Sequence, residues 1–140
     1  MGISCPKEGS FIGYKYVNKV DKRDMSFTLF TMYYPLYSGP QLIAILEIPE
    51  DAKRVTNKYG QSRCDKAKVL RFEDFEGNEL DITEAYTCQF NGDRCIKYTI
   101  GDTVYADSFD ENPDTTKNGI YFFMSKEECI DRVNEIRMEM

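Results

Sequence analysis

No histidine occurs anywhere in the 140 residues of the chain. Histidine is the usual general base near neutral pH, so its absence excludes Ser-His-Asp and Cys-His catalysis as well as histidine-ligated zinc. Any catalysis would have to use carboxylates, tyrosine, lysine, arginine or a thiol. Since the sequence assembles no catalytic constellation of these groups, we predict no catalytic residue, no cofactor and no metal site.

Long apolar runs are also missing. The longest, Leu42 to Leu46, has the length of a strand and is far short of the ~20 residues that span a membrane. The N-terminal segment MGISCPKEGS holds no apolar stretch of the kind found in a signal peptide. The five cysteines form no CxxC pair, and no Asn-x-Ser/Thr acceptor is present. These absences predict a soluble intracellular protein with reduced thiols and no membrane contact.

Clusters of basic residues are missing as well. The net charge is −6, from 24 acidic and 18 basic residues spread along the chain, without the Lys/Arg cluster that follows a phosphate backbone. We therefore predict no nucleic-acid partner. Hydrophobic residues make up 41% and aromatic residues 14% of the chain, which is enough for a real core. We expect a loose N-terminal leader at residues 1–10 and a single globular domain over residues 11–140.

Alternation of apolar and polar residues predicts a series of β-strands. The segment 41–48 is apolar on both faces, so we place it as a central strand that Pro49 ends. The charged segment 50–65 is interpreted as a surface loop. The other expected strands cover residues 11–17, 25–34, 66–75, 95–100, 103–105 and 119–124.

The strongest hairpin signal in the chain is Asn91-Gly92. A two-residue hairpin there would place Cys88 opposite Cys95, with the two Cα atoms about 5.5 Å apart. That spacing would admit a disulfide. Two reduced thiols packed side by side are favoured instead, because the compartment is expected to be reducing.

The C-terminal segment carries the signals of a helix. Ser125 is a good N-cap residue, and Glu128 three residues later completes a capping box. Cys129, Val133 and Ile136 repeat at helical spacing and predict one buried stripe on a helix of about 13 residues. The whole pattern predicts an α+β fold, a mostly antiparallel twisted sheet of roughly six to eight strands with one C-terminal helix packed on it.

The acidic segment DSFDEN at residues 107–112 is the clearest candidate site, because the expected scaffold does not require these residues. Four acidic residues bring together oxygens that a hard cation could use, namely Asp107, Asp110, Glu111 and Asp114. Their spacing departs from the EF-hand series, and the loop glycine is missing. A solvated turn, shaped by side-chain hydrogen bonds from Asp110 and Asn112 to nearby backbone, is the simpler interpretation.

Several motifs resemble an uncharacterised domain that accompanies pentapeptide repeats in bacteriophage and large DNA virus proteins. They are AKVLRF at 67–72, YTIGDTVYADSFDEN at 98–112 and NGIYFFMSKEEC at 118–129, and the run IPEDAKRV at 48–55 also fits. The resemblance covers most of the chain, although that family commonly has histidine where this chain has Tyr121. Because the repeats are missing here, the resemblance implies a stand-alone form of the module, located in the host cytoplasm or the virion.

A narrower resemblance connects the same strand with an enzyme family. NGIYFFMSKEEC is similar to the Gly-Ile-Tyr-Phe-Ala…Ser-Lys-Ser motif of poly-ADP-ribose polymerase-like transferases, in which the tyrosine stacks on nicotinamide. The resemblance implies that Tyr121 would stack on a base and that Ser125 would supply a hydroxyl near the helix start. The His-Gly motif of that family is missing, and an aromatic strand that leads into a capped helix explains the same residues.

Three hypotheses for the function follow. The first is a small, non-enzymatic viral or phage-type accessory module that acts through a protein partner. The second is an ADP-ribosyltransferase-like enzyme or nucleotide-binding protein, and the third is a virion-associated structural protein. The predicted ligand- or partner-binding residues are Asp107, Asp110, Glu111, Asn112, Tyr121 and Ser125.

Overall fold

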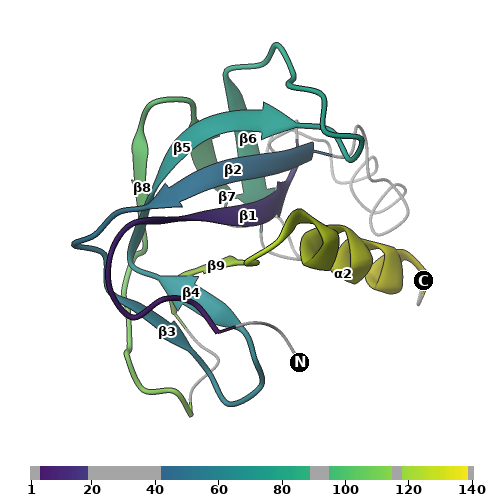
Figure 1. Cartoon of the computed structure of the whole chain (residues 1–140). Helices are drawn as coiled ribbons and strands as arrows, with labels where there is room; N and C mark the ends of the chain where they lie inside the picture. Colours follow the sequence, from purple (N-terminus) through teal and green to yellow (C-terminus); the bar gives the residue numbers. More distant parts are fainter. Residues whose placement is uncertain (1–3, 19–41, 89–94, 115–117, 139–140) are drawn as a thin grey trace.

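The computed structural model describes residues 4–18, 42–88, 95–114 and 118–138 (Figure 1). Within these ranges the chain forms nine β-strands and one helix, and every pairing between strands is antiparallel. This is the α+β fold that the sequence predicts. The described strands form three sheets instead of the single sheet that we expected.

The largest sheet has the strand order β1-β2-β5-β8. Its strands cover Phe11–Val17 (β1), Leu42–Ile48 (β2), Lys66–Glu73 (β5) and Thr103–Tyr105 (β8). β2 lies between two partners and is buried on both faces, which confirms the prediction made from its continuous apolar run.

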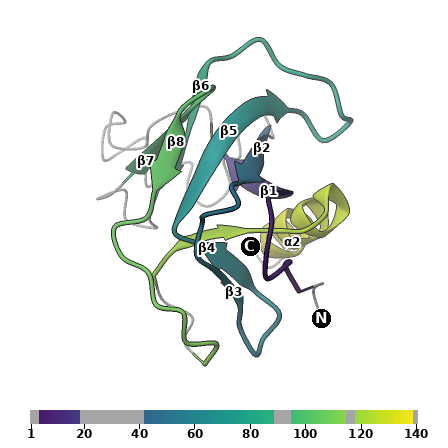
Figure 2. The same ribbon diagram turned by 60° about the vertical axis from the view of Figure 1, so that its left-hand side comes forward.

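Two smaller sheets complete the described fold. One has the order β3-β4-β9, with strands Arg54–Thr56 (β3), Ser62–Cys64 (β4) and Ile120–Phe122 (β9). The other pairs β6 (Glu84–Cys88) with β7 (Cys95–Thr99). Figures 1 and 2 show the three-stranded sheet below the large sheet, with the helix α2 (Lys126–Met138) beside β1 in both views.

The segment 50–65, predicted as a surface loop, contains the hairpin β3–β4, so that prediction is wrong. Each of its strands is three residues long, which is too short for alternation to be recognised. Asn57 shapes the turn, because its Oδ1 accepts the backbone N–H groups of Tyr59 and Gln61 at 2.9 and 3.0 Å. Gly60 completes the turn with a φ of 82°.

β1 connects the three sheets. One of its edges pairs with β2 along the full strand. On its other edge, Tyr14 forms a bridge with Phe123, which follows β9, and Asn18 forms a bridge with Tyr86 of β6. Between these two bridges no other strand of the described chain pairs with this edge of β1, so the strands separate there and leave room for side chains.

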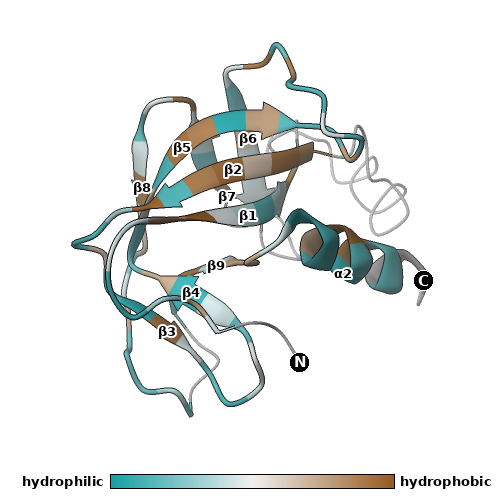
Figure 3. Cartoon of the chain, in the orientation of Figure 1, coloured by the Kyte–Doolittle hydropathy of each residue, from teal (hydrophilic) through white to brown (hydrophobic). Residues whose placement is uncertain are grey.

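The core lies on both faces of β2. One face of β2 belongs to the main core cluster, which also includes residues of the two smaller sheets. This face carries Leu42, Ala44, Leu46 and Ile48. The side of Ile43 and Ile45 packs against α2 through Cys129. Figure 3 shows apolar colour along most of β2 and mainly hydrophilic colour on α2, so one narrow stripe attaches the helix to the sheet.

The helix begins as predicted. The Ser125 Oγ accepts the backbone N–H of Glu128 at 3.1 Å, which confirms the N-cap. The helix has 13 residues, and the predicted stripe is confirmed at Cys129 and Val133, which are both buried. The continuation of the stripe at Ile136 lies outside the side chains that the structure describes.

Other predictions fall wholly or partly outside the described residues. The expected strand at 25–34 and the Asn91-Gly92 turn lie there entirely. Cys88 and Cys95 are register partners in the β6–β7 pair, which confirms that they face each other across the hairpin. Their side chains lie outside those that the structure describes, so the prediction of two reduced thiols stays a prediction. Among the described thiols, those of Cys5, Cys64 and Cys129 are free and buried.

The N-terminal segment packs on the three-stranded sheet. Cys5 is buried, and its backbone N–H donates to the Thr56 Oγ1 at 2.9 Å. The Arg54 guanidinium donates to the Gly9 carbonyl at 2.8 Å. The division into a leader at 1–10 and a domain at 11–140 stays a prediction.

Candidate functional site

β9 lies between two pockets. The sequence predicts that Ile120 and Phe122 share one face of this strand, and both are buried in the main core cluster. Tyr121 and Phe123 are half-buried on the opposite face. Tyr121 lines both pockets, so the residue singled out by the sequence borders open space instead of being enclosed in the core.

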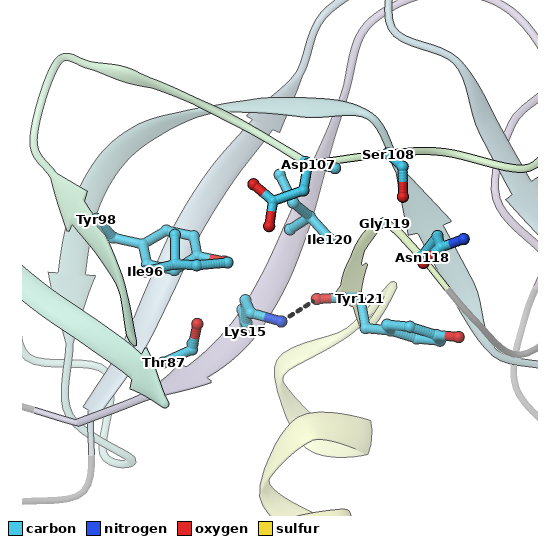
Figure 4. Close-up of a pocket in the computed structure, with 11 residues that line it drawn as sticks. Lys15, Thr87, Ile96, Tyr98, Asp107, Ser108, Asn118, Gly119, Ile120 and Tyr121 are labelled. Atoms are coloured by element: carbon cyan, nitrogen blue, oxygen red, sulfur yellow. Dashed lines mark hydrogen bonds between the residues drawn. The ribbon is translucent and has the colours of Figure 1, made fainter. Parts of the chain in front are cut away.

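The first pocket, which we call the Lys15 pocket, has a volume of about 350 Å³. Side chains from β1, β6, β7 and β9 and from the segments 106–108 and 118–119 line it. The buried Tyr98 and Ile120 form its inner wall, whereas Asp107 and Ser108 are exposed at its rim. Figure 4 shows Lys15 between the β6–β7 side chains and Tyr121, so a lysine stands in the gap that opens between β1 and β9.

Lys15 lies on the same face of β1 as the buried Val17, since side chains alternate along a strand. Its Nζ donates to the Tyr121 carbonyl at 2.7 Å, just beyond the point where the β1–β9 bridge ends. Within the described part of the chain no carboxylate forms an ion pair with this amine. Burial lowers the pKa of Lys15 to about 8, because the charged form loses its hydration without gaining a counter-charge.

The second pocket, which we call the helix groove, has a volume of about 570 Å³ and lies between the three-stranded sheet and α2. Its sheet side is aromatic, with Tyr59 60% exposed. Its helix side carries the acids Glu128, Asp131 and Glu135 against one base, Arg132, and that arginine already pairs with Glu135 at 3.3 Å. The groove therefore combines aromatic side chains with a negative edge.

Arg63, on β4, is completely buried and holds the acidic segment in place. Its guanidinium donates to the backbone carbonyls of Asp110 and Asn112, the latter at 2.9 Å. The ring of Phe109 lies 5.3 Å from the guanidinium carbon. A buried charge needs such partners, so the backbone of the segment 107–112 and the Phe109 ring have a structural role in holding Arg63.

The side chains of the acidic segment shape its backbone as predicted. The Asp110 Oδ1 accepts the N–H of Asn112, and the Asn112 Oδ1 accepts the N–H of Asp114, both at 2.9 Å. Glu111 is exposed. The structure therefore gives Asp110 and Asn112 a local structural role.

The six predicted site residues do not form one site. Asp107 and Tyr121 both line the Lys15 pocket, and Tyr121 also lines the helix groove. Ser125 lines neither pocket and caps the helix. A role in binding for any of the six stays a prediction.

Lys15 and Arg63 are the residues that sequence reasoning missed. In the strand FIGYKYV, Lys15 lies two residues from both Gly13 and Val17, so the three share one face of the strand. That face could have been recognised as internal. Arg63 gave no such signal, because it lies in a three-residue strand within a charged segment.

Other site types find no support in the described ranges. No group of three or more cysteine, aspartate or glutamate side chains is placed to hold a metal ion among the described residues. In the same residues no helix is long and apolar enough to cross a membrane.

The fold and the two pockets define a small α+β protein with a lysine-containing cavity and an acidic, aromatic groove. Residues 1–129 match the model of a family described as a family of unknown function (DUF5758), and the chain belongs to this family. Neither the curated proteins nor the solved structures contain a match to the chain. Membership confirms that this is an uncharacterised domain, and it assigns no activity.

Proposed function

We propose that the protein is a non-enzymatic interaction module, of the viral or phage accessory type that its sequence resembles, and that the helix groove holds its protein partner. The observation that carries the proposal is the joint presence of exposed aromatic surface and a row of acids in one groove. Tyrosine is enriched where protein partners meet, because it offers a large apolar ring and a polar tip.

The groove also defines the chemistry of the partner. Glu128, Asp131 and Glu135 are spaced three and four residues apart, so they share one face of α2. Arg132 offsets only one of these charges. A complementary segment therefore presents lysine or arginine next to an apolar side chain, so that the base meets the acids and the apolar group covers Tyr59 and Phe123.

The direct test is selection from a displayed library of 12-residue peptides. We expect the selected peptides to be rich in lysine or arginine next to leucine or an aromatic residue. Their affinity should fall at least tenfold in Asp131→Lys and in Tyr59→Ala, and the Asp131→Lys effect should shrink in high salt.

Two control variants locate the binding surface. Glu50→Lys reverses an exposed charge at the turn after β2, away from the groove, and should leave the affinity unchanged. Glu111→Lys reverses an exposed charge on the acidic segment. Loss of binding in Glu111→Lys but not in Asp131→Lys would place the binding surface on the acidic segment instead. Selected peptides without an excess of lysine or arginine would refute the proposal that the helix groove binds the partner.

A second candidate function is an ADP-ribosyltransferase-like or nucleotide-binding protein. One observation favours it, namely that Tyr121 borders both pockets and could offer its ring to a base. Against it, the Ser125 hydroxyl is engaged in capping the helix. A rise in melting temperature with NAD that Tyr121→Ala abolishes would replace the interaction proposal with this one.

A further inference from the structure

Lys15 lines a cavity, and within the described residues its amine makes one hydrogen bond. The Tyr121 carbonyl can only accept a hydrogen bond, so it engages one N–H of the amine at 2.7 Å. In the neutral amine the lone pair is not used by this contact. Lys15 lines the pocket, and its hydrogen bond to the Tyr121 carbonyl leaves the lone pair and the second N–H of the neutral amine unengaged by this contact (Figure 4).

The surroundings of Lys15 favour its neutral form. Burial lowers its pKa to about 8. Burial also raises the pKa of each of the Cys64 and Cys129 thiols to about 12, and raises that of the Tyr98 hydroxyl. These three groups are uncharged at neutral pH, and Asp107 at the rim is the carboxylate that lines the pocket.

A lowered pKa has a direct chemical consequence. At neutral pH the neutral fraction of Lys15 is therefore much larger than that of a lysine at its ordinary pKa. Lysines desolvated in this way are the ones that form Schiff bases.

We propose that the Lys15 pocket binds a small hydroxylated aldehyde or ketone and that Lys15 captures it as an imine. A cavity of about 350 Å³ accepts a compound of a few carbons. The hydroxyls of Thr87 and Ser108 and the carboxylate of Asp107 offer hydrogen-bond partners for the hydroxyl groups of the ligand. Ile96 and Ile120 provide apolar surface for its carbon chain.

The reaction balances without any further reagent. The Lys15 lone pair attacks the carbonyl carbon, the C=O π electrons move to the oxygen, and one amine proton moves to that oxygen, which gives a carbinolamine. The hydroxyl then leaves as water with the second amine proton, and a C=N bond forms. Amine and carbonyl compound thus yield imine and water.

The experiment uses the full chain with glyceraldehyde and sodium cyanoborohydride at pH 7.4. The hydride reduces an imine to a stable secondary amine, which intact mass and peptide mapping then locate. We expect Lys15 to be labelled at least tenfold faster than Lys97, a lysine that is 55% exposed on β7. Peptide mapping separates this product from labelling of the N-terminal amine.

Concentration and pH dependence separate a binding pocket from an amine that is merely reactive. Labelling of Lys15 should saturate with glyceraldehyde concentration. Because Ser108 lines the pocket and is exposed, Ser108→Ala should raise the half-saturating concentration without changing the melting temperature. With cyanoborohydride in excess, so that imine formation limits the labelling, the rate should rise with pH and level off above about 8. If the labelling rate of Lys15 stays proportional to glyceraldehyde concentration up to high concentration, the proposal that the pocket binds this compound is overturned.

Two lysine variants complete the test. Lys15→Met keeps the length of the side chain and removes the amine, so it should abolish the fast label while the protein keeps its circular dichroism spectrum. Lys97→Met should leave the fast label intact. Labelling of Lys15 no faster than of Lys97 in the wild-type chain would overturn the proposal.

Discussion

Arg63→Met is the sharpest test of how the acidic segment is held. Methionine fills a similar volume and makes none of the hydrogen bonds that the guanidinium gives to the Asp110, Asn112 and Asn118 carbonyls. Each bond from a charged donor contributes about 1.5–3 kcal/mol. Methionine is in turn easier to bury than a charge, which offsets part of the loss.

The expected net loss is about 3–4 kcal/mol in the free energy of unfolding. For a chain of this size the free energy of unfolding falls by about 2 kcal/mol per molar urea. The midpoint of urea denaturation should therefore fall by about 1.5–2 M. Limited proteolysis should then cut within 107–114 before other described segments, because the loss of Arg63 releases that backbone.

Arg63→Lys is the matched control for this prediction. Lysine keeps the charge but lacks the planar fork that reaches several carbonyls, so it should recover less than half of the lost stability. A midpoint shift below about 0.5 M in Arg63→Met would refute the idea that these bonds hold the segment.

Three further outcomes are expected. Ser125→Ala should cost about 1 kcal/mol in urea denaturation, because the helix loses its N-cap. Gly13→Ala should lower the melting temperature at a cost of about 1–3 kcal/mol, because its Cβ would lie 2.9 Å from Phe122. Burial raises the pKa of Glu73, but its ion pairs with Lys126 and Arg71 lower it more. Their contribution is present above the unfolded pKa and fades as pH falls, so wild type should lose stability below about pH 4.5 more steeply than Glu73→Gln.

The parts of the fold that the sequence could predict have strong local signals. The run LIAILEI indicates a strand buried on both faces, and β2 has this position. Ser125 and Glu128 mark a helix start through hydrogen bonds between close neighbours. In each case the information lies within a few residues, so no knowledge of distant segments is needed.

The partition of the strands into three sheets could not be predicted in the same way. It depends on which edges of β1 accept partners, and those partners lie far along the chain. The short strands β3 and β4 are set by their pairing with each other and with β9 rather than by a pattern of their own. Tertiary context decides such elements.

The candidate site shows the same limit. Tyr121 could be singled out from an aromatic strand next to a helix cap, and it does border both pockets. Lys15 reaches the Tyr121 carbonyl across a separation of 106 residues. Only the fold brings these two groups together, so the pocket they share could not be derived from either segment alone.

The position of β1 has a consequence for the route by which the protein folds. This strand lies near the N-terminus, yet its second edge is occupied by Tyr86 and Phe123, which are synthesised much later. Until they arrive, β1 exposes unpaired backbone that can pair with other chains. Such distant pairing also closes long loops, which slows folding. We expect refolding yield to fall with increasing protein concentration, and aggregates formed during refolding to involve β1 first.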